Sequence, residues 1–317
     1  MELLKLLADG QFHSGVELAQ QLNVSRTTIS KRVADWQAQG LDIDSVTGKG
    51  YRLQTPIDWL NQQKIYQYIP SNIQELITDF AIYPIISSTN DAVAQSLQKN
   101  AKSGVVCLAE MQSAGRGRRG RTWLSPPAGT FYGSVGWVFS EGFQVVEGLS
   151  LAIGVAVVDA LRSCGVQGLQ LKWPNDIVWQ GKKLGGILIE NTINGTKISS
   201  SVVGIGINVN QEIFDESLPN PVSVYQISNF EFKISNLLES LCVFLQKYYL
   251  QLRQLHFNFL DKAYTEALYR YQQTHEFKKG EQILRGEING VAKDGKLILH
   301  SNGKELRFAF KEVEFVL

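Results

Sequence analysis

Apolar residues follow three different patterns along the 317-residue chain, and each pattern predicts a separate unit. Residues 1 to about 55 show short helical periods followed by VTGKGYRL, a glycine-bearing segment typical of a small hairpin. From about 65 to 270, apolar runs such as VVCLAE and VVGIGINV alternate with longer helical periods such as SLAIGVAVVDALRS, which predicts a central domain of strands and helices. From about 275 onward, short strands are separated by the turn signals KDGK and SNGK. We therefore expect domains at 1–62, 63–270 and 271–317, with the first connection around Pro56.

The first unit has the spacing of a helix-turn-helix. In SGVELAQQLNVSRTTISKRVADWQ, a short helix is followed by a turn and by a second helix, which Ser25 can cap. Ile29, Val33 and Trp36 fall on one face of the second helix and are expected to pack inward. The other side chains of this helix, with the lysine of the GKGY turn, suit phosphates and base edges, and the predicted DNA contacts are Ser25, Arg26, Thr27, Thr28, Lys31, Arg32 and Lys49. The alternative is a three-helix packing module whose basic residues are only solvated.

Composition limits the classes of protein without assigning a function. Lysine and arginine number 31 and aspartate and glutamate 30, so any affinity for nucleic acid or an anionic membrane must be local. Lys5 and Asp9 interrupt the apolar N-terminus, which predicts an amphipathic helix instead of a signal peptide. The apolar stretch 149–161 is too short to span a membrane and suits a buried helix, so we expect a cytoplasmic protein. The chain has three cysteines, Cys107, Cys164 and Cys242, which lie far apart in the sequence. Their odd number and wide spacing predict unreactive thiols instead of metal ligands or disulfides.

The segment GRGRRGRTW (115–123) concentrates arginines in a flexible setting. Glycines permit positive φ and let a ligand approach the backbone closely. A guanidinium group can bind two oxygens of one phosphate or carboxylate at the same time. An RGG-like nucleic-acid tract and a disordered basic linker are two alternatives. The strand-like VVCLAE before the segment and the apolar TWLSPPAGTFYGSV after it favour a loop of a folded sheet that wraps an anionic ligand. The loop contains four positive side chains that repel one another: Arg116, Arg118, Arg119 and Arg121. We therefore expect the loop to be mobile until a negatively charged ligand binds.

Three downstream motifs carry further candidate groups. LKWPND (171–176) places Lys172 beside a proline-fixed turn, where a lysine can stabilise the anion that develops in acyl or phosphoryl transfer. An isolated lysine is more commonly a plain surface residue. LGGILIE (184–190) and GIGIN (204–208) contain glycines that allow a close approach to the backbone, although glycines can also relieve crowding between strands.

Taken in order, SSTN (87–90), GRGRRGRTW, KWPND, KKLGGILIE and GIGIN resemble the biotin protein ligases, and the helix-turn-helix followed by GKGY resembles the members that also repress the biotin operon. The resemblance implies an α+β multidomain fold: a winged helix-turn-helix, a central mixed sheet with helices related to class II aminoacyl-tRNA synthetases, and a C-terminal SH3-like barrel. It also implies two reaction steps. The biotin carboxylate attacks the α-phosphate of ATP to give biotinoyl-5′-adenylate. A lysine of the biotin carboxyl carrier protein of acetyl-CoA carboxylase then accepts the biotinoyl group.

The resemblance assigns roles to individual residues. Lys172 reaches the carboxylate and phosphate, and with Arg116 and Arg118 it forms the candidate catalytic set. Mg²⁺ accompanies ATP and neutralises phosphate charge. Asn175 and Asp176 are expected to position the incoming lysine. By the resemblance, the biotin pocket is lined by Ser88, Thr89, Asn90 and Gln112, and the adenylate is covered by Arg116, Gly117 and Arg118. The implied binding site for biotin and ATP also includes Lys172, Gly185, Gly186, Gly204, Gly206 and Asn208.

In the repressor-type members the adenylate is also the corepressor, which implies a homodimer that sets two heads on a palindromic operator. The chain departs from the family pattern in two places. The segment after GIGIN lacks the tryptophan that some members set against adenine, so Val209 and Val222 are the candidates there, and the chain ends KEVEFVL in place of a GEVSLR-like close. Two other functions stay open: a regulator that senses a small anion without catalysis, and a lipoate-type ligase. Lys172 beside the arginine loop argues against the first, and GRGRRGR against the second.

Overall fold

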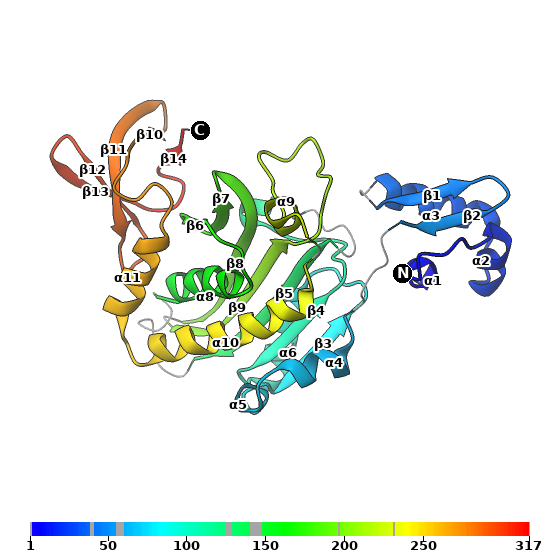
Figure 1. The fold of residues 1–317 in the computed structure, drawn as a ribbon. Coiled ribbons are helices and arrows are strands. Elements are labelled where there is room, and N and C mark those ends of the chain that lie inside the picture. Colours follow the sequence, from blue (N-terminus) through cyan, green and yellow to red (C-terminus); the bar gives the residue numbers. More distant parts are fainter. Residues whose placement is uncertain are drawn as a thin grey trace.

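The computed structural model describes residues 2–38, 41–54, 60–123, 129–139, 148–195, 197–230 and 232–316. The expected connection at Pro56 and the segment 124–128 after the arginine loop lie outside the described residues, as do the side chains of Lys64, Tyr68, Arg119 and Lys197. The strands form a two-stranded, a seven-stranded and a five-stranded sheet (Figure 1). One sheet falls within each of the three predicted units.

The N-terminal head is a helix-turn-helix followed by a β-hairpin, as predicted. Its elements are α1 (Glu2–Leu7), α2 (Gly15–Gln21), α3 (Arg26–Ala38), β1 (Ile43–Val46) and β2 (Gly50–Leu53). Ser14 caps α2 in a capping box with Glu17. Ile29, Val33 and Trp36 are buried in a small core of the head, as their spacing predicted. Gly50 has a φ of +100°, and a Cβ there would overlap the His13 carbonyl oxygen, so the GKGY turn needs glycine at this position.

The central sheet is mixed, in agreement with the expected architecture. Its strand order is β3-β4-β5-β9-β8-β7-β6, and among the described strands only the pair β3 and β4 is parallel. The strands are β3 (Asp79–Tyr83), β4 (Val105–Ala109), β5 (Thr130–Val138), β6 (Leu169–Lys172), β7 (Asp176–Trp179), β8 (Lys182–Asn194) and β9 (Lys197–Asn208).

Helices cover both faces of this sheet. The predicted core helix is α8 (Leu149–Ser163), which is buried along most of its length and packs against α10 (Ile234–Arg253) and α11 (Phe257–Ala267). The helix α6 (Thr89–Asn100) packs over Val202, whereas Val203 belongs to the core beneath α8. Because successive strand residues point to opposite faces, α6 and α8 lie on opposite sides of the sheet. The other helices in the described residues of the central part are α4 (Gln62–Tyr68), α5 (Ser71–Gln74), η1 (Arg118–Gly120) and α9 (Val224–Ser228).

The C-terminal part is an antiparallel sheet in the order β13-β12-β11-β10-β14, and Figure 1 shows α11 leading into it. Its strands are β10 (Thr274–Lys279), β11 (Gln282–Val291), β12 (Leu297–Ser301), β13 (Lys304–Phe308) and β14 (Glu314–Phe315). Its buried residues, such as Phe277 and Ile288, share one continuous core with the central domain. The indole of Trp173 donates a hydrogen bond of 2.9 Å to the Gly295 carbonyl. The KWPND turn is therefore attached to the C-terminal sheet.

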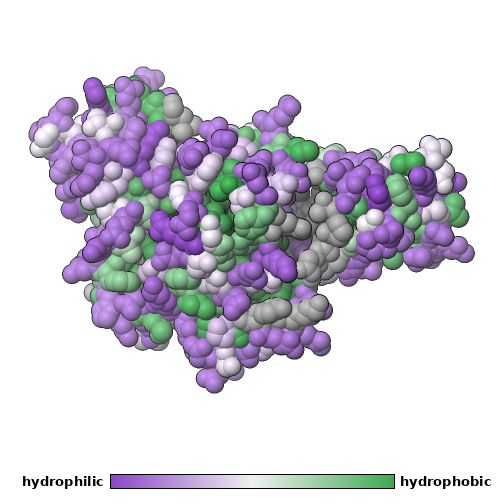
Figure 2. Space-filling view, in the orientation of Figure 1, coloured by the Kyte–Doolittle hydropathy of each residue, from purple (hydrophilic) through white to green (hydrophobic). Residues whose placement is uncertain are grey.

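Hydrophilic residues cover most of the face shown in Figure 2. Within the described part of the chain, no helix has both the length and the apolar character needed to cross a bilayer. The cysteines are free thiols, and burial raises the pKa of Cys107 and of Cys242 to about 12, which keeps both protonated and unreactive at neutral pH. No described cluster of histidine, cysteine, aspartate and glutamate is arranged to hold a metal ion.

Candidate active site

A cavity of about 470 Å³ opens on the α6 face of the central sheet. Its floor is made by β5, β8 and β9, where Tyr132 and Gly186 are both in register with Gly206 on opposite sides. The start of α6, the arginine loop, the KWPND turn and the residues around β14 form its walls. The cavity brings together the predicted residues Ser88, Thr89, Asn90, Gln112, Arg116, Gly117, Arg118, Lys172, Gly186, Gly204, Gly206 and Asn208.

The polar residues at the start of α6 form one hydrogen-bonded group. The side-chain oxygen of Gln112 accepts hydrogen bonds from the Thr89 backbone N–H at 2.8 Å and from the Thr89 hydroxyl at 3.1 Å. The Ser134 hydroxyl on β5 lies 2.7 Å from Thr89 Oγ1 and 2.6 Å from Asn90 Oδ1. Ser88, Thr89 and Asn90 are each at most 4% exposed, so this group is preorganised inside the protein.

The glycines of β8 and β9 make room for side chains. A Cβ on Gly204 would overlap the Asn90 amide, so Gly204 leaves the space that Asn90 fills. A Cβ on Gly206 would lie 2.9 Å from the Trp123 indole, and one on Gly186 would lie 3.2 Å from the same ring. These two glycines thus let Trp123, the last residue of GRGRRGRTW, lie flat against the sheet.

Gly185 and Asn208 contribute differently from the other predicted residues. Gly185 pairs with Ile207 and faces the core beneath α8, so it does not line the cavity. A Cβ there would come within 2.7 Å of the Gly206 carbonyl oxygen, and Gly185 therefore serves close strand packing, one of the two interpretations of the glycine pattern. Asn208 lines the cavity, and its amide donates a hydrogen bond of 3.1 Å to the Val222 carbonyl.

The arginine loop has a defined path. Backbone hydrogen bonds from Gly117 to Arg121 at 2.7 Å and from Trp123 to Gly115 at 2.9 Å close it into a narrow hairpin-like turn. The Arg116 guanidinium binds the carboxylates of Asp91 and Glu190. The predicted mobility of the empty loop stays a prediction, but repulsion among its arginines is offset by acids that the motif itself does not contain.

Two further cations of the cavity, Arg118 and Lys172, lie against aromatic rings of the C-terminal part. The Arg118 guanidinium carbon is 3.7 Å from the centre of the Phe310 ring, and Lys172 Nζ is 5.1 Å from that of Phe315. Both distances are within the range of cation–π attraction. The segment KEVEFVL therefore contributes to the cavity through Phe315 although it lacks the family's usual close.

Lys172 is half-buried and lies near one carboxylate and two other cations. Burial lowers its pKa below the ordinary value, the Asp176 carboxylate opposes that shift, and the cations Arg270 and Lys183 add to it. Asp176 itself binds Lys183 Nζ at 2.7 Å. A positive charge held in such a partly dry site interacts strongly with an anion placed beside it.

Asn175 of the KWPND turn lines the cavity and also has a structural task. The Asn175 side-chain amide donates to the Ile187 carbonyl at 2.9 Å, and the Ile187 N–H donates to the Asn175 carbonyl, so this residue ties the turn to β8. Val209 and Val222 are buried in the main core and do not line the cavity, so neither is positioned to stack on adenine. Phe214, from the same segment, does line it.

Sequence reasoning missed several residues that line the cavity or bind the side chains lining it. Ser134, Asp91 and Glu190 belong to its polar network. The alternation of β8 carries a signal for Glu190, because the face that bears Gly186 also bears every second residue after it. Phe310 and Phe315 come from a distant part of the chain, and no local pattern indicates their arrival.

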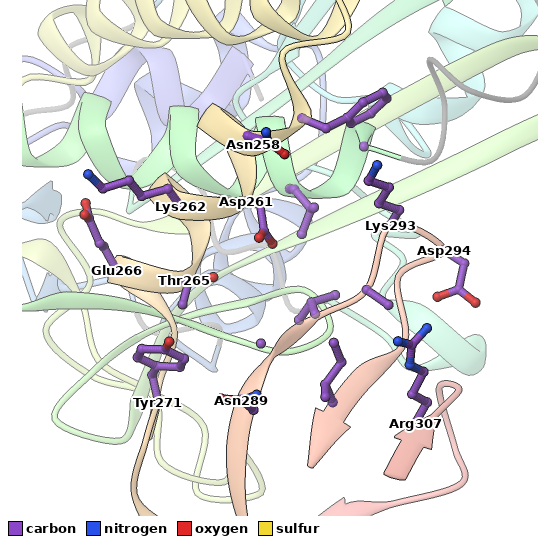
Figure 3. A pocket seen from close by; sticks show the side chains of 17 residues that line it. Asn258, Asp261, Lys262, Thr265, Glu266, Tyr271, Asn289, Lys293, Asp294 and Arg307 are labelled. Atoms are coloured by element: carbon purple, nitrogen blue, oxygen red, sulfur yellow. The ribbon is translucent and has the colours of Figure 1, made fainter. Parts of the chain in front are cut away.

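A larger cavity of about 900 Å³ lies between α11 and the C-terminal strands (Figure 3). None of the predicted site residues lines it. Its charged residues balance, with Asp261, Glu266 and Asp294 against Lys262, Lys293 and Arg307. The smaller cavity therefore holds the candidate active site.

The candidate DNA surface lies on α3 and in the β1–β2 turn. Arg26, Lys31, Arg32 and Lys49 are exposed, and within the described part of the chain none of them forms an ion pair. The Ser25 hydroxyl accepts a hydrogen bond from the Thr28 N–H at 3.1 Å and lies 2.8 Å from the Thr28 hydroxyl, which makes it the cap of α3. Thr27 is exposed and Thr28 is half-buried.

Two family models match the chain: the biotin/lipoate A/B protein ligase family over residues 82–208 and an HTH domain over residues 1–52. The "Bifunctional ligase/repressor BirA" of Escherichia coli (strain K12) is 39% identical over 220 residues, which are 69% of this chain and 66% of the relative. The chain thus spans about two thirds of the length of that relative. A "Biotin--[acetyl-CoA-carboxylase] ligase" of Paracoccus denitrificans is 31% identical over 218 residues, 67% of this chain and 90% of the relative.

Solved structures share the fold. A biotin protein ligase from Aquifex aeolicus in complex with biotin and ATP matches with a TM-score of 0.62 at 24% identity, over 75% of this chain and 98% of that chain. At this identity the likeness concerns the fold alone. Together with the sequence relatives, it means that the chain belongs to the biotin protein ligases, within the biotin/lipoate A/B protein ligase family.

Proposed function

We propose that this chain is an ATP-dependent biotin protein ligase and that its head makes it a biotin-responsive repressor of the biotin operon. The observation that carries the proposal is the single cavity in which the SSTN residues, the loop arginines, Lys172 and the glycine-bearing strands meet. The names of the sequence relatives support the same reaction and the same pairing of ligase with repressor. Their biotin-ligase names favour biotin over the lipoate alternative.

In the first step an oxygen of the biotin carboxylate attacks the α-phosphorus of ATP. The bond from that phosphorus to the bridging oxygen breaks, and pyrophosphate leaves. The Lys172 ammonium reduces the repulsion between the carboxylate and the phosphate and stabilises the negative charge that builds on the α-phosphoryl oxygens and the leaving pyrophosphate, and its partial burial strengthens this effect. Arg118 and Gly117 of the loop cover the adenylate, which excludes water from a readily hydrolysed acyl phosphate.

In the second step the amine of a carrier-protein lysine attacks the acyl carbon of the adenylate. An amide bond forms, AMP leaves, and the amine gives up a proton. The partner we propose is the biotin carboxyl carrier protein of acetyl-CoA carboxylase. Asp176 faces the cavity from the KWPND turn and is the residue we assign to the positioning of the incoming lysine, with Asn175 bracing that turn from behind.

Magnesium is expected to enter with ATP. The cavity offers the carboxylates of Asp176 and Glu314, and no described group of three ligands forms a dedicated metal cage. One or two carboxylates with substrate phosphates are a usual environment for Mg²⁺, so the residues present fit an ion carried by the nucleotide. The ion supplies charge neutralisation on the phosphates.

The ligase proposal is tested by incubating the full chain with biotin, MgATP and an acceptor biotin-carrier domain. Mass spectrometry should find the biotinyl increment on one lysine of the acceptor, and the increment should disappear when ATP is omitted. A parallel reaction supplies lipoic acid and a lipoyl-carrier domain, and modification in that reaction alone would identify the chain as a lipoate ligase instead. An acceptor that stays unmodified with either acid would contradict the proposed activity.

The repressor proposal rests on the head. Exposed cations and hydroxyls lie on α3, and Lys49 is exposed in the hairpin turn of the same head; these side chains suit DNA phosphates and base edges. We propose that the adenylate promotes a homodimer, which places two heads on the two halves of a palindromic operator. In a gel-shift titration, biotin plus ATP should tighten operator binding. DNA affinity that is independent of both ligands would contradict this regulation.

We infer the finer architecture on the same grounds: a central sheet related to class II aminoacyl-tRNA synthetases, an SH3-like C-terminal barrel, and domain boundaries near 62 and 270. The mixed central sheet and the five-stranded antiparallel C-terminal sheet are compatible with this description. A cytoplasmic location, where ATP and carrier protein are present, belongs to the same proposal.

A further inference from the structure

Arg116 is held between two carboxylates. Its Nη1 lies 2.6 Å and 2.8 Å from the two Asp91 oxygens, and its Nη2 lies 3.1 Å and 2.9 Å from those of Glu190. The pKa of Arg116 is above its ordinary value, mainly because of the hydrogen bonds to Asp91 and, after a smaller opposing effect of burial, to Glu190. The cluster of one guanidinium and two carboxylates has a net charge of about −1, so Arg116 in this cluster attracts an incoming anion poorly.

Glu190 extends this network into the protein. Its Oε2 accepts a hydrogen bond of 2.6 Å from the Asn90 side-chain amide, which is only 4% exposed as a residue. The other atom of that amide, Oδ1, lies 2.6 Å from the Ser134 hydroxyl. Asn90 is therefore fixed at both ends, and Gly204 provides the space for it. A continuous chain of hydrogen bonds joins the arginine loop to the buried polar group at the start of α6.

Backbone contacts close the base of the loop at the residue that the carboxylates bind. Arg116 bridges to Thr122 across the hairpin-like turn, and Trp123 binds back to Gly115. Asp91 lies on α6 and Glu190 on β8, so the Arg116 side chain connects the loop to a helix and to a strand. Charge-assisted hydrogen bonds with two partners are stronger than neutral ones and fix direction.

We propose that Asp91 and Glu190 are positioning residues that clamp Arg116, hold the arginine loop over the cavity, and tie it through Asn90 to the predicted biotin pocket. The proposal rests on the proposed function for the identity of the pocket's ligand, but the clamp itself is a property of the free chain. Arg116 then acts as the anchor of the loop, while Arg118 remains the arginine placed toward the nucleotide.

The clamp is tested by trypsin cleavage of the full chain without ligand, because the loop presents several arginines to the protease. Asp91→Asn and Glu190→Gln should each increase the rate of cleavage within the arginine loop severalfold. The double variant should be cleaved about ten times faster or more, because each substitution removes charge-assisted hydrogen bonds to the Arg116 guanidinium. Glu305→Gln removes a carboxylate paired with Arg307 on β13 and serves as the control, with the wild-type rate. A double variant that melts at the wild-type temperature and is cleaved at the wild-type rate would overturn the clamp.

The link to the biotin pocket needs a kinetic readout. Glu190→Gln should raise the KM for biotin more than it lowers kcat and should release the adenylate severalfold faster, whereas Glu190→Asp, which keeps a carboxylate, should recover part of the loss. Equal changes in Glu190→Gln and Glu190→Asp, or an unchanged KM, would overturn the link. If the wild-type chain forms no adenylate, the proposed function fails, while the cleavage rates still decide the clamp.

Discussion

The chain carries two basic clusters that look alike in sequence but differ in structure. On α3, Arg26, Lys31 and Arg32 are exposed, and in the described part of the chain they have no acidic partner. In the loop, Arg116 binds two carboxylates and Arg118 lies on an aromatic ring. The first cluster is available to a polyanion from outside, whereas the second is built into the wall of a cavity.

This difference shows that the partners of a cation decide what it can bind. Exposed cations on a helix keep their full charge for phosphates, and their binding is sensitive to salt. Cations enclosed with acids and rings lose long-range attraction but gain fixed positions, which catalysis requires. The clusters should therefore respond differently when single charges are removed.

The largest effect is expected at Lys172. Lys172→Ala should lower the rate of biotinyl-adenylate formation by about a hundredfold or more, near 3 kcal/mol, because it removes a charge that acts mainly in the transition state. Lys182→Ala, an exposed lysine outside the cavity, is the matched control and should keep the wild-type rate. Near-normal synthesis by Lys172→Ala would remove Lys172 from the catalytic set and contradict the view that the enclosed cations of the cavity serve catalysis.

A smaller effect is expected at Arg118. Arg118→Ala should speed dissociation of the adenylate by about tenfold, because it removes one charge-assisted hydrogen-bonding group from the anionic intermediate. The exposed Arg285→Ala on β11 controls for the removal of an arginine. Adenylate release at the wild-type rate would mean that the loop does not retain the intermediate.

The smallest effect is expected in the head. Arg32→Ala or Lys31→Ala should weaken operator binding severalfold and reduce the slope of log affinity against log salt by about 1 for each phosphate that is no longer neutralised. Adenylate formation should stay unchanged in both. Lys5→Ala on α1, a lysine paired with Glu2, should alter neither property. An unchanged salt slope in the α3 variants would favour the packing-module interpretation of the head.

Local patterns predicted the head well. The spacing of Ile29, Val33 and Trp36 indicated the buried face of α3, and the glycine-bearing GKGY turn indicated the hairpin. The buried helix α8 followed in the same way from continuous apolar character. Each of these features depends on neighbours close in sequence, which periodicity can reveal.

The cavity was only partly predictable. Motifs and resemblance named most of the residues that line it, but Gly185 points to the other face of β8, because strand alternation separates it from Gly186. The acids that bind Arg116 and the rings beside Arg118 and Lys172 come from distant segments. Such partners depend on strand order and on the docking of the C-terminal sheet, which no local pattern contains.

The central claim is that this cavity makes and holds biotinyl-adenylate. The most direct measurement mixes the full chain with biotin and MgATP in the absence of any acceptor, removes free nucleotides by gel filtration, and quantifies biotinyl-AMP in the protein fraction together with released pyrophosphate. We predict close to one biotinyl-AMP retained per chain, with a matching amount of pyrophosphate. No biotinyl-AMP, or pyrophosphate release that does not depend on biotin, would contradict the account.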